Sequence, residues 1–280
     1  TEYRYLCGRG EEKEWGGVPT RGKLGGTIRG ICENVEYLKN LGVNAIYINP
    51  IFVAGEYHKY DLLDYFHIDP CFGTDDDFHR LIDVFHANGL KVIIDGVFNH
   101  CGSFNKWLDR ERIYENQPGY EKGAYVSADS PYRSFFKFNN EHSWPYNPYY
   151  DGWWGHETLP KLNFENSPKL VEYIMNIGRK WVSPPYNVDG WRLDVAADLG
   201  LSADFNHKFW QDFRKNVKEA NPEAVIYAEH YGDATSWLKG GEWDSIMNYD
   251  TFMEPITWYL TGMEMLERLE HANLRCGIRS

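Results

Sequence analysis

Residues 75–95 read DDDFHRLIDVFHANGLKVIID, a stretch that changes from helical to strand spacing without a break. Its first part predicts an amphipathic helix over about 75–88, because acidic residues occupy the positive end of the helix dipole and Gly89 stops the helix. The apolar run Lys91-Val-Ile-Ile-Asp95 then predicts a buried strand. A helix that leads straight into a buried strand is typical of folds in which helices alternate with parallel strands.

The same alternation continues on both sides of this stretch. Apolar residues at helical spacing over 28–41 precede a predicted strand at 43–49. Later helices are predicted at 170–182 and 205–219, and later strands at 188–195, 224–229 and 245–248. A strand is thus followed by a helix about five times, which predicts a parallel sheet with its active site at the carboxyl ends of the strands.

The composition narrows the class of protein. The chain has 280 residues, of which 42% are hydrophobic and 25% charged, and its net charge is −12. This balance excludes small disulfide scaffolds, coiled coils and disordered tails, and the length fits two average domains or one α/β barrel of about 250 residues. A protein with this much negative charge repels nucleic acids and anionic membranes, so both are poor partners. No apolar run approaches the roughly 18 residues that a membrane-spanning helix needs. With no C-x-x-C pair present, we expect free thiols, mostly buried, at Cys7, Cys32, Cys71, Cys101 and Cys276.

The stretch 99–165 interrupts the alternation. It has no clean period and is rich in aromatic residues, Pro, Asn and Gly. A structureless loop of this length is uncommon inside a compact domain, so we expect a small inserted subdomain after the second strand. Aromatic rings suit the C–H faces of sugars. We expect most of these rings, Trp144 among them, to form the core of the subdomain and only a few to meet a ligand.

Polar side chains end three of the predicted strands. They are contributed by Asp95-Gly-Val-Phe-Asn-His100, by Asp189-Gly-Trp-Arg-Leu-Asp194 and by Glu229. Arg192 and Asp194 are two positions apart and point to the same side, where the guanidinium is expected to keep the carboxylate ionised at neutral pH. Two carboxylates, one ionised and one a proton donor, are what glycosidic bond cleavage requires. The alternative is a structural ion pair and an exposed strand end, but three such clusters beside an aromatic insertion favour catalysis.

These motifs resemble the signatures of the α-amylase family of glycoside hydrolases, particularly its neopullulanase and cyclomaltodextrinase branch. The segments 95–100, 190–194 and 228–229 are similar to the first three signatures of the family, and Leu159-Pro-Lys-Leu-Asn163 is similar to a further one in its inserted domain. Residues 57–61 and 64–70 are similar to the loop after the second strand of the family, and the likeness covers about 25–264. The resemblance implies a (β/α)8 barrel of TIM-barrel type.

The resemblance also implies a role for each matching residue. Asp194 is the expected nucleophile, Glu229 the expected general acid and later base, and Arg192 the residue that orients and ionises Asp194. The other residues expected to bind substrate are Tyr60, His58, Asp95, His100 and Tyr231. Asn99 corresponds to a calcium ligand in many members, so a structural calcium ion is expected there, although the chemistry itself requires no cofactor.

The chain departs from the family pattern in several places. Ala197-Asp198 replaces the Asn-Glu of neopullulanases, Gly25-Gly26-Thr27 lacks the acid of a calcium-holding Gly-Gly-Asp, and no His-Asp follows Glu229 to supply a third carboxylate. Residues 1–17 hold no apolar run for a first barrel strand, and five visible strands fall short of the roughly eight of a closed barrel. We therefore expect an internal, incomplete piece of a barrel, with its first part at 1–98, the inserted subdomain at 99–165 and its continuation at 166–280.

The leading hypothesis is a retaining hydrolase that cleaves α-1,4 bonds of starch, pullulan or cyclomaltodextrins. One alternative is a non-catalytic relative that binds glucan or a partner protein on the same fold. Another is an α-glucan transglycosylase or isomerase, which keeps the same two carboxylates. The presence of Asp194, Arg192 and Glu229 together favours an enzyme; the oligomeric state and the compartment, cytoplasmic or secreted, stay open.

Overall fold

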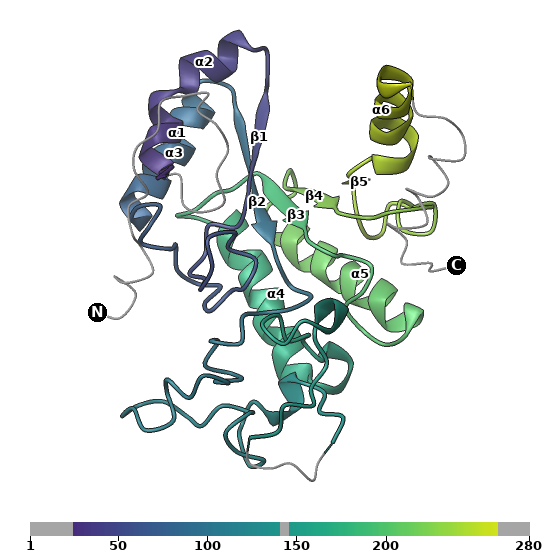
Figure 1. The fold of residues 1–280 in the computed structure, drawn as a ribbon. Coiled ribbons are helices and arrows are strands. Elements are labelled where there is room, and N and C mark those ends of the chain that lie inside the picture. Colours follow the sequence, from purple (N-terminus) through teal and green to yellow (C-terminus); the bar gives the residue numbers. More distant parts are fainter. Residues whose placement is uncertain (1–24, 141–145, 263–280) are drawn as a thin grey trace.

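The computed structural model describes residues 25–140 and 146–262. Several features singled out in the sequence lie outside the described residues: the polar stretch 1–17 with Cys7, Trp144, the end of the family likeness at Glu264, and Cys276. The described part is built around one sheet, with a long non-repetitive segment below it in the view of Figure 1.

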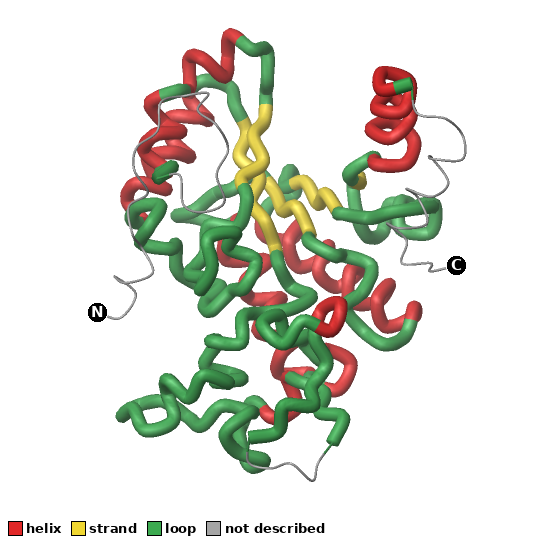
Figure 2. The backbone as a smooth tube through the Cα atoms, in the orientation of Figure 1, coloured by secondary structure: helices red, strands yellow, loops and turns green. Residues whose placement is uncertain are grey.

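The sheet has five strands in chain order, and each hydrogen-bonds to the next. All four neighbouring pairs are parallel, as predicted. The strands, yellow in Figure 2, are β1 (Ala45–Ile48), β2 (Lys91–Gly96), β3 (Gly190–Leu193), β4 (Val225–Ala228) and β5 (Ser245–Ile246). The carboxyl ends of all five strands therefore lie along one edge of the sheet.

The helices fall close to their predicted positions, with two differences. They are α1 (Ile28–Glu33), α2 (Val35–Asn40), α3 (Asp75–Ala87), α4 (Pro168–Val182), α5 (Ala203–Ala220) and α6 (Glu254–Thr261). The single helix predicted at 28–41 is wrong: Asn34 separates α1 from α2, and its side-chain amide bonds the Gly30 carbonyl at 2.8 Å in competition with the backbone ladder.

The second difference is the connection from β4 to β5, which consists of turns, so the predicted alternation of strand and helix is interrupted there. Gly232 and Gly240 adopt positive φ angles of 85° and 92° there, a conformation that interrupts a helix. The connection packs instead through aromatic rings. Trp237 stacks on Trp243 at 4.4 Å between centroids and on His207 of α5 at 4.0 Å.

Helices α4 and α5 pack side by side against the sheet (Figure 1). Trp191 of β3 is fully buried, and its indole Nε1 donates to the Gly178 carbonyl of α4 at 3.0 Å. A Cβ atom at Gly178 would lie 2.5 Å from the ring of Phe213 on α5, so only glycine allows the two helices to approach this closely. This packing holds β3, which carries Arg192, rigidly in the middle of the sheet.

The segment between β2 and α4 forms loops and short 3-10 turns, shown green and red in Figure 2. Many of its rings are core, as expected. Trp107 is buried and packs edge-on against Phe135 at 5.2 Å and against Tyr173 of α4 at 4.9 Å. A few rings stay exposed, among them Tyr149 and Trp154. The boundaries predicted for an inserted subdomain at 99–165 stay a prediction.

The cysteine expectation holds in part. Cys32 and Cys101 are buried free thiols, whereas Cys71 takes part in a disulfide, so the prediction of a free thiol at that position is wrong. Among the described helices, none combines the length and apolar character that crossing a bilayer requires.

Candidate active site

The sheet register aligns the chemistry-bearing residues on three adjacent strands. Asp95 of β2 is the partner of Arg192 of β3, which in turn is the partner of Tyr227 of β4. Asp194 and Glu229 each follow directly after their strand. Since parallel strands end at the same edge, the three acids expected from the sequence come together there.

Arg192 joins all three carboxyl groups. Its Nη1 lies 2.6 Å from Asp194 Oδ1 and 3.1 Å from both oxygens of Asp95, and its Nη2 lies 3.1 Å from Glu229 Oε2. Asp95, Arg192 and Asp194 are buried, and the Glu229 side chain is 17% exposed. The candidate nucleophile and the candidate acid thus contact two nitrogens of one guanidinium.

The charge balance at this centre differs from the expectation. Burial raises the pKa of Asp194 well above its usual range, the Asp95 charge raises it further, and Arg192 opposes both without offsetting them. Burial likewise raises the pKa of Asp95. Arg192 lowers the pKa of Asp194, as predicted from the sequence, but one positive charge is shared among three buried or half-buried carboxyls, so the net shift is upward; the ionised state of Asp194 stays a prediction.

Two tyrosines hold Asp95 from the other side. The Tyr47 hydroxyl donates to Asp95 Oδ2 at 2.5 Å, and the Tyr60 hydroxyl donates to the same oxygen at 3.1 Å. Burial raises the pKa of Tyr60 to about 12, so this hydroxyl stays protonated and remains a donor. Tyr60 was predicted from the family likeness. Tyr47 was missed, and its one signal is a polar tip in the middle of the apolar strand Ala45–Ile48.

Of the two candidate histidines, His58 lies beside Tyr60, and His100 lies in the segment that follows β2. His58 Nδ1 accepts from the Tyr60 backbone amide at 3.0 Å, and its ring stacks on the Tyr60 ring at 6.2 Å. His100 is 2% exposed, and burial lowers its pKa to about 4. A neutral imidazole has one donor and one acceptor nitrogen, which suits a hydroxyl-rich ligand.

A strained residue supports the candidate acid. Val195, directly after Asp194, has a positive φ of 46°, which a β-branched residue rarely adopts. In this conformation its amide donates to Glu229 Oε2 at 3.0 Å. The strain is located between the two candidate catalytic groups, where it aims a backbone donor at the carboxyl.

Tyr231 lies two positions after Glu229 and is 47% exposed. Its ring stacks on Tyr249 at 4.4 Å with an interplanar angle of 10°. Tyr249 was not predicted. It comes from the segment after β5, and its hydroxyl donates to Met247 Sδ at 3.4 Å. Met247 Sδ in turn accepts from Arg192 Nε at 3.4 Å, so this stack is connected to the charged centre.

The surroundings of Asn99 do not fit a calcium ion. The Asn99 amide nitrogen donates to the Asp198 carbonyl, and Lys161 Nζ pairs with Asp198 Oδ1 at 2.8 Å. Calcium requires six to eight oxygen ligands, whereas amide hydrogens and an ammonium group point into this region. Within 25–140 and 146–262, no group of three or more His, Cys, Asp or Glu residues is arranged to hold a metal.

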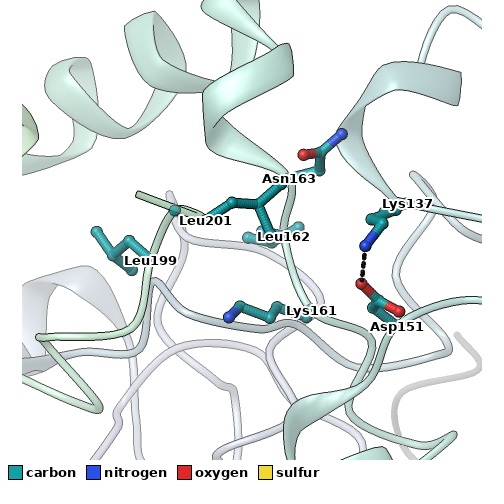
Figure 3. Close-up of a pocket in the computed structure, with 8 residues that line it drawn as sticks. Lys137, Asp151, Lys161, Leu162, Asn163, Leu199 and Leu201 are labelled. Carbon is teal, nitrogen blue, oxygen red and sulfur yellow. Dashed lines mark ion pairs between the residues drawn. The ribbon is translucent and has the colours of Figure 1, made fainter. Parts of the chain in front are cut away.

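A small pocket opens next to this region, between the inserted segment and the loop after β3 (Figure 3). Lys161 and the ion pair of Lys137 with Asp151, 3.4 Å long, face it together with Leu199 and Leu201. None of the candidate catalytic residues lines it. The pocket is therefore separate from the acidic centre.

Comparisons with known proteins support one family. The family model described as "Alpha amylase, catalytic domain" matches residues 8–259. Maltogenic alpha-amylase of Bacillus acidopullulyticus is 38% identical over 256 residues, which cover 89% of this chain and 40% of that protein. Neopullulanase 2 of Thermoactinomyces vulgaris is 37% identical over 246 residues, which cover 88% of this chain and 39% of that protein. The chain thus spans about two fifths of these relatives.

Solved structures of other proteins also resemble this chain. The type III pullulan hydrolase from Thermococcus kodakarensis matches with a TM-score of 0.70 at 36% identity, covering 84% of this chain and 39% of that one. The ligand-free cyclic α-maltosyl-(1→6)-maltose hydrolase from Arthrobacter globiformis matches with a TM-score of 0.74 at 30% identity, covering 98% of this chain and 58% of that one.

Proposed function

The chain belongs to the α-amylase family of catalytic domains, and from this premise we propose that the complete protein is a retaining glycosidase that cleaves α-1,4-glucosidic bonds in starch, pullulan or cyclomaltodextrins. The observation that carries the proposal is the guanidinium of Arg192, which contacts both Asp194 and Glu229. Family membership confirms the predicted α/β fold of TIM-barrel type and supports the glycosidase class.

In the first step, an Asp194 oxygen forms a bond to the anomeric carbon while the bond from that carbon to the leaving oxygen breaks. Glu229 transfers its proton to the leaving oxygen. In the second step, Glu229 takes a proton from water, the water oxygen attacks the anomeric carbon, and Asp194 is released as a carboxylate. The Val195 amide, bonded to Glu229 at 3.0 Å, keeps the acid oriented through both steps.

The remaining residues bind the sugar being cleaved. Tyr60 presents a flat ring and is held by its bond to Asp95, and His58 stacks beside it. His100 is neutral and offers hydrogen bonds to sugar hydroxyls. Tyr231 is exposed on the side of Glu229, where it meets the sugar beyond the bond that is cut.

The proposal is tested with Asp194→Asn and Glu229→Gln in the full-length protein. Each variant removes a carboxylate and keeps nearly the same shape, so hydrolysis of soluble starch should fall by at least about 10³-fold while the circular dichroism spectrum is retained. Near-native turnover by Asp194→Asn would contradict the nucleophile assignment. A reducing-sugar assay on the unmodified protein also separates an enzyme from a glucan-binding relative, because a binding protein releases no new ends.

A further inference from the structure

One turn of the inserted segment exposes a tryptophan that does not contribute to the core. Trp154 is 73% exposed, and its backbone lies in the left-handed region with φ 51° and ψ 26°. Both features cost free energy, since an indole in water is unfavourable and a residue with a Cβ atom is strained at positive φ. Such strain persists where the surroundings impose it and commonly marks a functional position.

The turn that carries Trp154 is tightly closed. The Gly155 amide donates to the Gly152 carbonyl at 2.9 Å, and the Trp153 amide donates to the Leu159 carbonyl at 2.9 Å. A Cβ atom at Gly152 would lie 2.2 Å from the His156 carbonyl oxygen, so the two sides of the turn touch. The backbone is thus held in a shape that projects the indole outward.

A row of rings leads from this turn to the candidate active site. Trp154 lies 5.6 Å from Trp153 with an interplanar angle of 30°, and Trp153 lies 5.6 Å from His100 at 33°. His156 stacks on Trp153 from the same turn at 6.0 Å. The row therefore runs from buried His100 to exposed Trp154, and neighbouring ring planes along it are inclined by 30° and 33°.

We propose that Trp153 and Trp154 form a platform that binds glucosyl units of a long α-glucan beyond the sugar held at His100. Flat rings in a row suit the apolar C–H faces of successive sugars. The identity of the ligand rests on the proposed function, whereas the platform rests on the exposure, the backbone conformation and the ring row. It extends substrate recognition from the acidic centre onto the inserted segment.

The binding test uses full-length protein carrying Asp194→Asn, so that ligands are not consumed. Isothermal titration compares this parent with the same protein carrying Trp154→Ala, using maltoheptaose as a long ligand and maltotriose as a short one. Loss of one stacking ring should weaken maltoheptaose binding about tenfold and change maltotriose binding by less than about twofold. Unchanged maltoheptaose affinity, or equal losses for both ligands, would overturn the proposal.

A stability test separates binding from a structural role. Glycine adopts positive φ without strain, so Trp154→Gly should keep or raise the melting temperature while losing the long-glucan affinity. A lower melting temperature with unchanged affinity would show that the ring is covered within the complete protein and would overturn the platform. Tyr120→Ala removes another exposed ring of the same segment, 47% exposed, and should leave maltoheptaose affinity unchanged; an equal loss there would overturn the assignment to Trp154.

Failure of the proposed function is distinguishable from failure of the platform. If the unmodified protein releases no reducing ends yet Trp154→Ala weakens maltoheptaose binding, the hydrolase proposal fails and the platform stands. If starch is hydrolysed and Trp154→Ala binds maltoheptaose like its parent, the platform fails and the hydrolase proposal stands.

Discussion

Three carboxyl groups contact one guanidinium at the carboxyl ends of neighbouring strands. Asp95, Asp194 and Glu229 all contact Arg192, and with every carboxyl ionised the group carries more negative than positive charge. Burial and mutual repulsion raise the pKa of Asp194, which makes its ionised form unfavourable to the folded state. Active sites commonly sacrifice stability in this way.

A pH-dependent stability follows from that raised pKa. A carboxyl group whose pKa is higher in the folded state than in the unfolded state destabilises the fold when it is ionised. This destabilisation is complete at a pH above the folded-state pKa, and it vanishes at a pH below the unfolded-state pKa of about 3.9. Asp194→Asn should therefore raise the melting temperature of the full-length protein at pH 7 by about 2–4 °C, and this gain should shrink as the pH falls towards 4.

Differential scanning calorimetry at several pH values measures this effect. Asp198→Asn is the matched control, because the Asp198 side chain is 62% exposed and pairs with Lys161 at the surface; its melting temperature should change little at either pH. A lower melting temperature for Asp194→Asn at pH 7 would mean that attraction to Arg192 outweighs burial and repulsion.

The connection from β1 to α3 presents His58 and Tyr60, and one buried ion pair stabilises it. Lys59 Nζ lies 2.6 Å from Asp69 Oδ2, with side chains 4% and 3% exposed. Lys59 also has a positive φ of 66° between the two sugar-binding candidates. Ordering of this loop therefore depends on a charge pair that has little access to water.

Lys59→Met should destabilise the full-length protein by roughly 3–5 kcal/mol, because it removes the ammonium group that pairs with the buried Asp69 carboxylate at 2.6 Å. It should also lower kcat/KM on starch, since His58 and Tyr60 lose their fixed positions. Lys208→Met is the control: Lys208 pairs with Asp212 on the exposed face of α5, and its loss should cost less than about 1 kcal/mol. Urea unfolding and starch kinetics measure both effects; equal costs for the two variants would refute the special role of the Lys59 pair.

The sheet as a whole has two strands with one described neighbour each, β1 and β5. Exposed strand edges promote association between chains, and α6 also exposes Tyr259 and Leu260, at 83% and 75%. Residues 1–280 expressed alone should therefore bind a hydrophobic dye, aggregate at micromolar concentration and show little starch hydrolysis.

Calorimetry and light scattering of residues 1–280 beside the full-length protein test this expectation. A sharp, reversible unfolding transition together with full-length activity would show that these residues suffice as a folded enzyme. The site itself would then be complete with Asp95, Asp194 and Glu229 as its carboxylates.

Much of this molecule is determined by local sequence alone. The spacing of apolar residues and the stop at Gly89 predict α3 and β2 within a residue or two, since both patterns depend on near neighbours in the chain. Acids at strand ends predict the candidate site, because strands that run parallel end at one edge. The break at Asn34 and the interrupted alternation between β4 and β5 escaped prediction, because a side-chain bond interrupts the helical ladder at Asn34 and positive-φ glycines form turns in the later connection.

The tertiary structure alone decided how those residues act on one another. Contacts between segments far apart in the chain produce four features of the molecule. These are the sharing of Arg192 among three carboxyls, the raised pKa of Asp194, the Tyr47 bond to Asp95 and the ring row from His100 to Trp154. The contacts at the acidic centre depend on the sheet register and on burial, and the ring row depends on the fold of the inserted segment. Burial and distance are properties of the packed chain, so residue types at given positions predicted the participants but not the electrostatics or the platform.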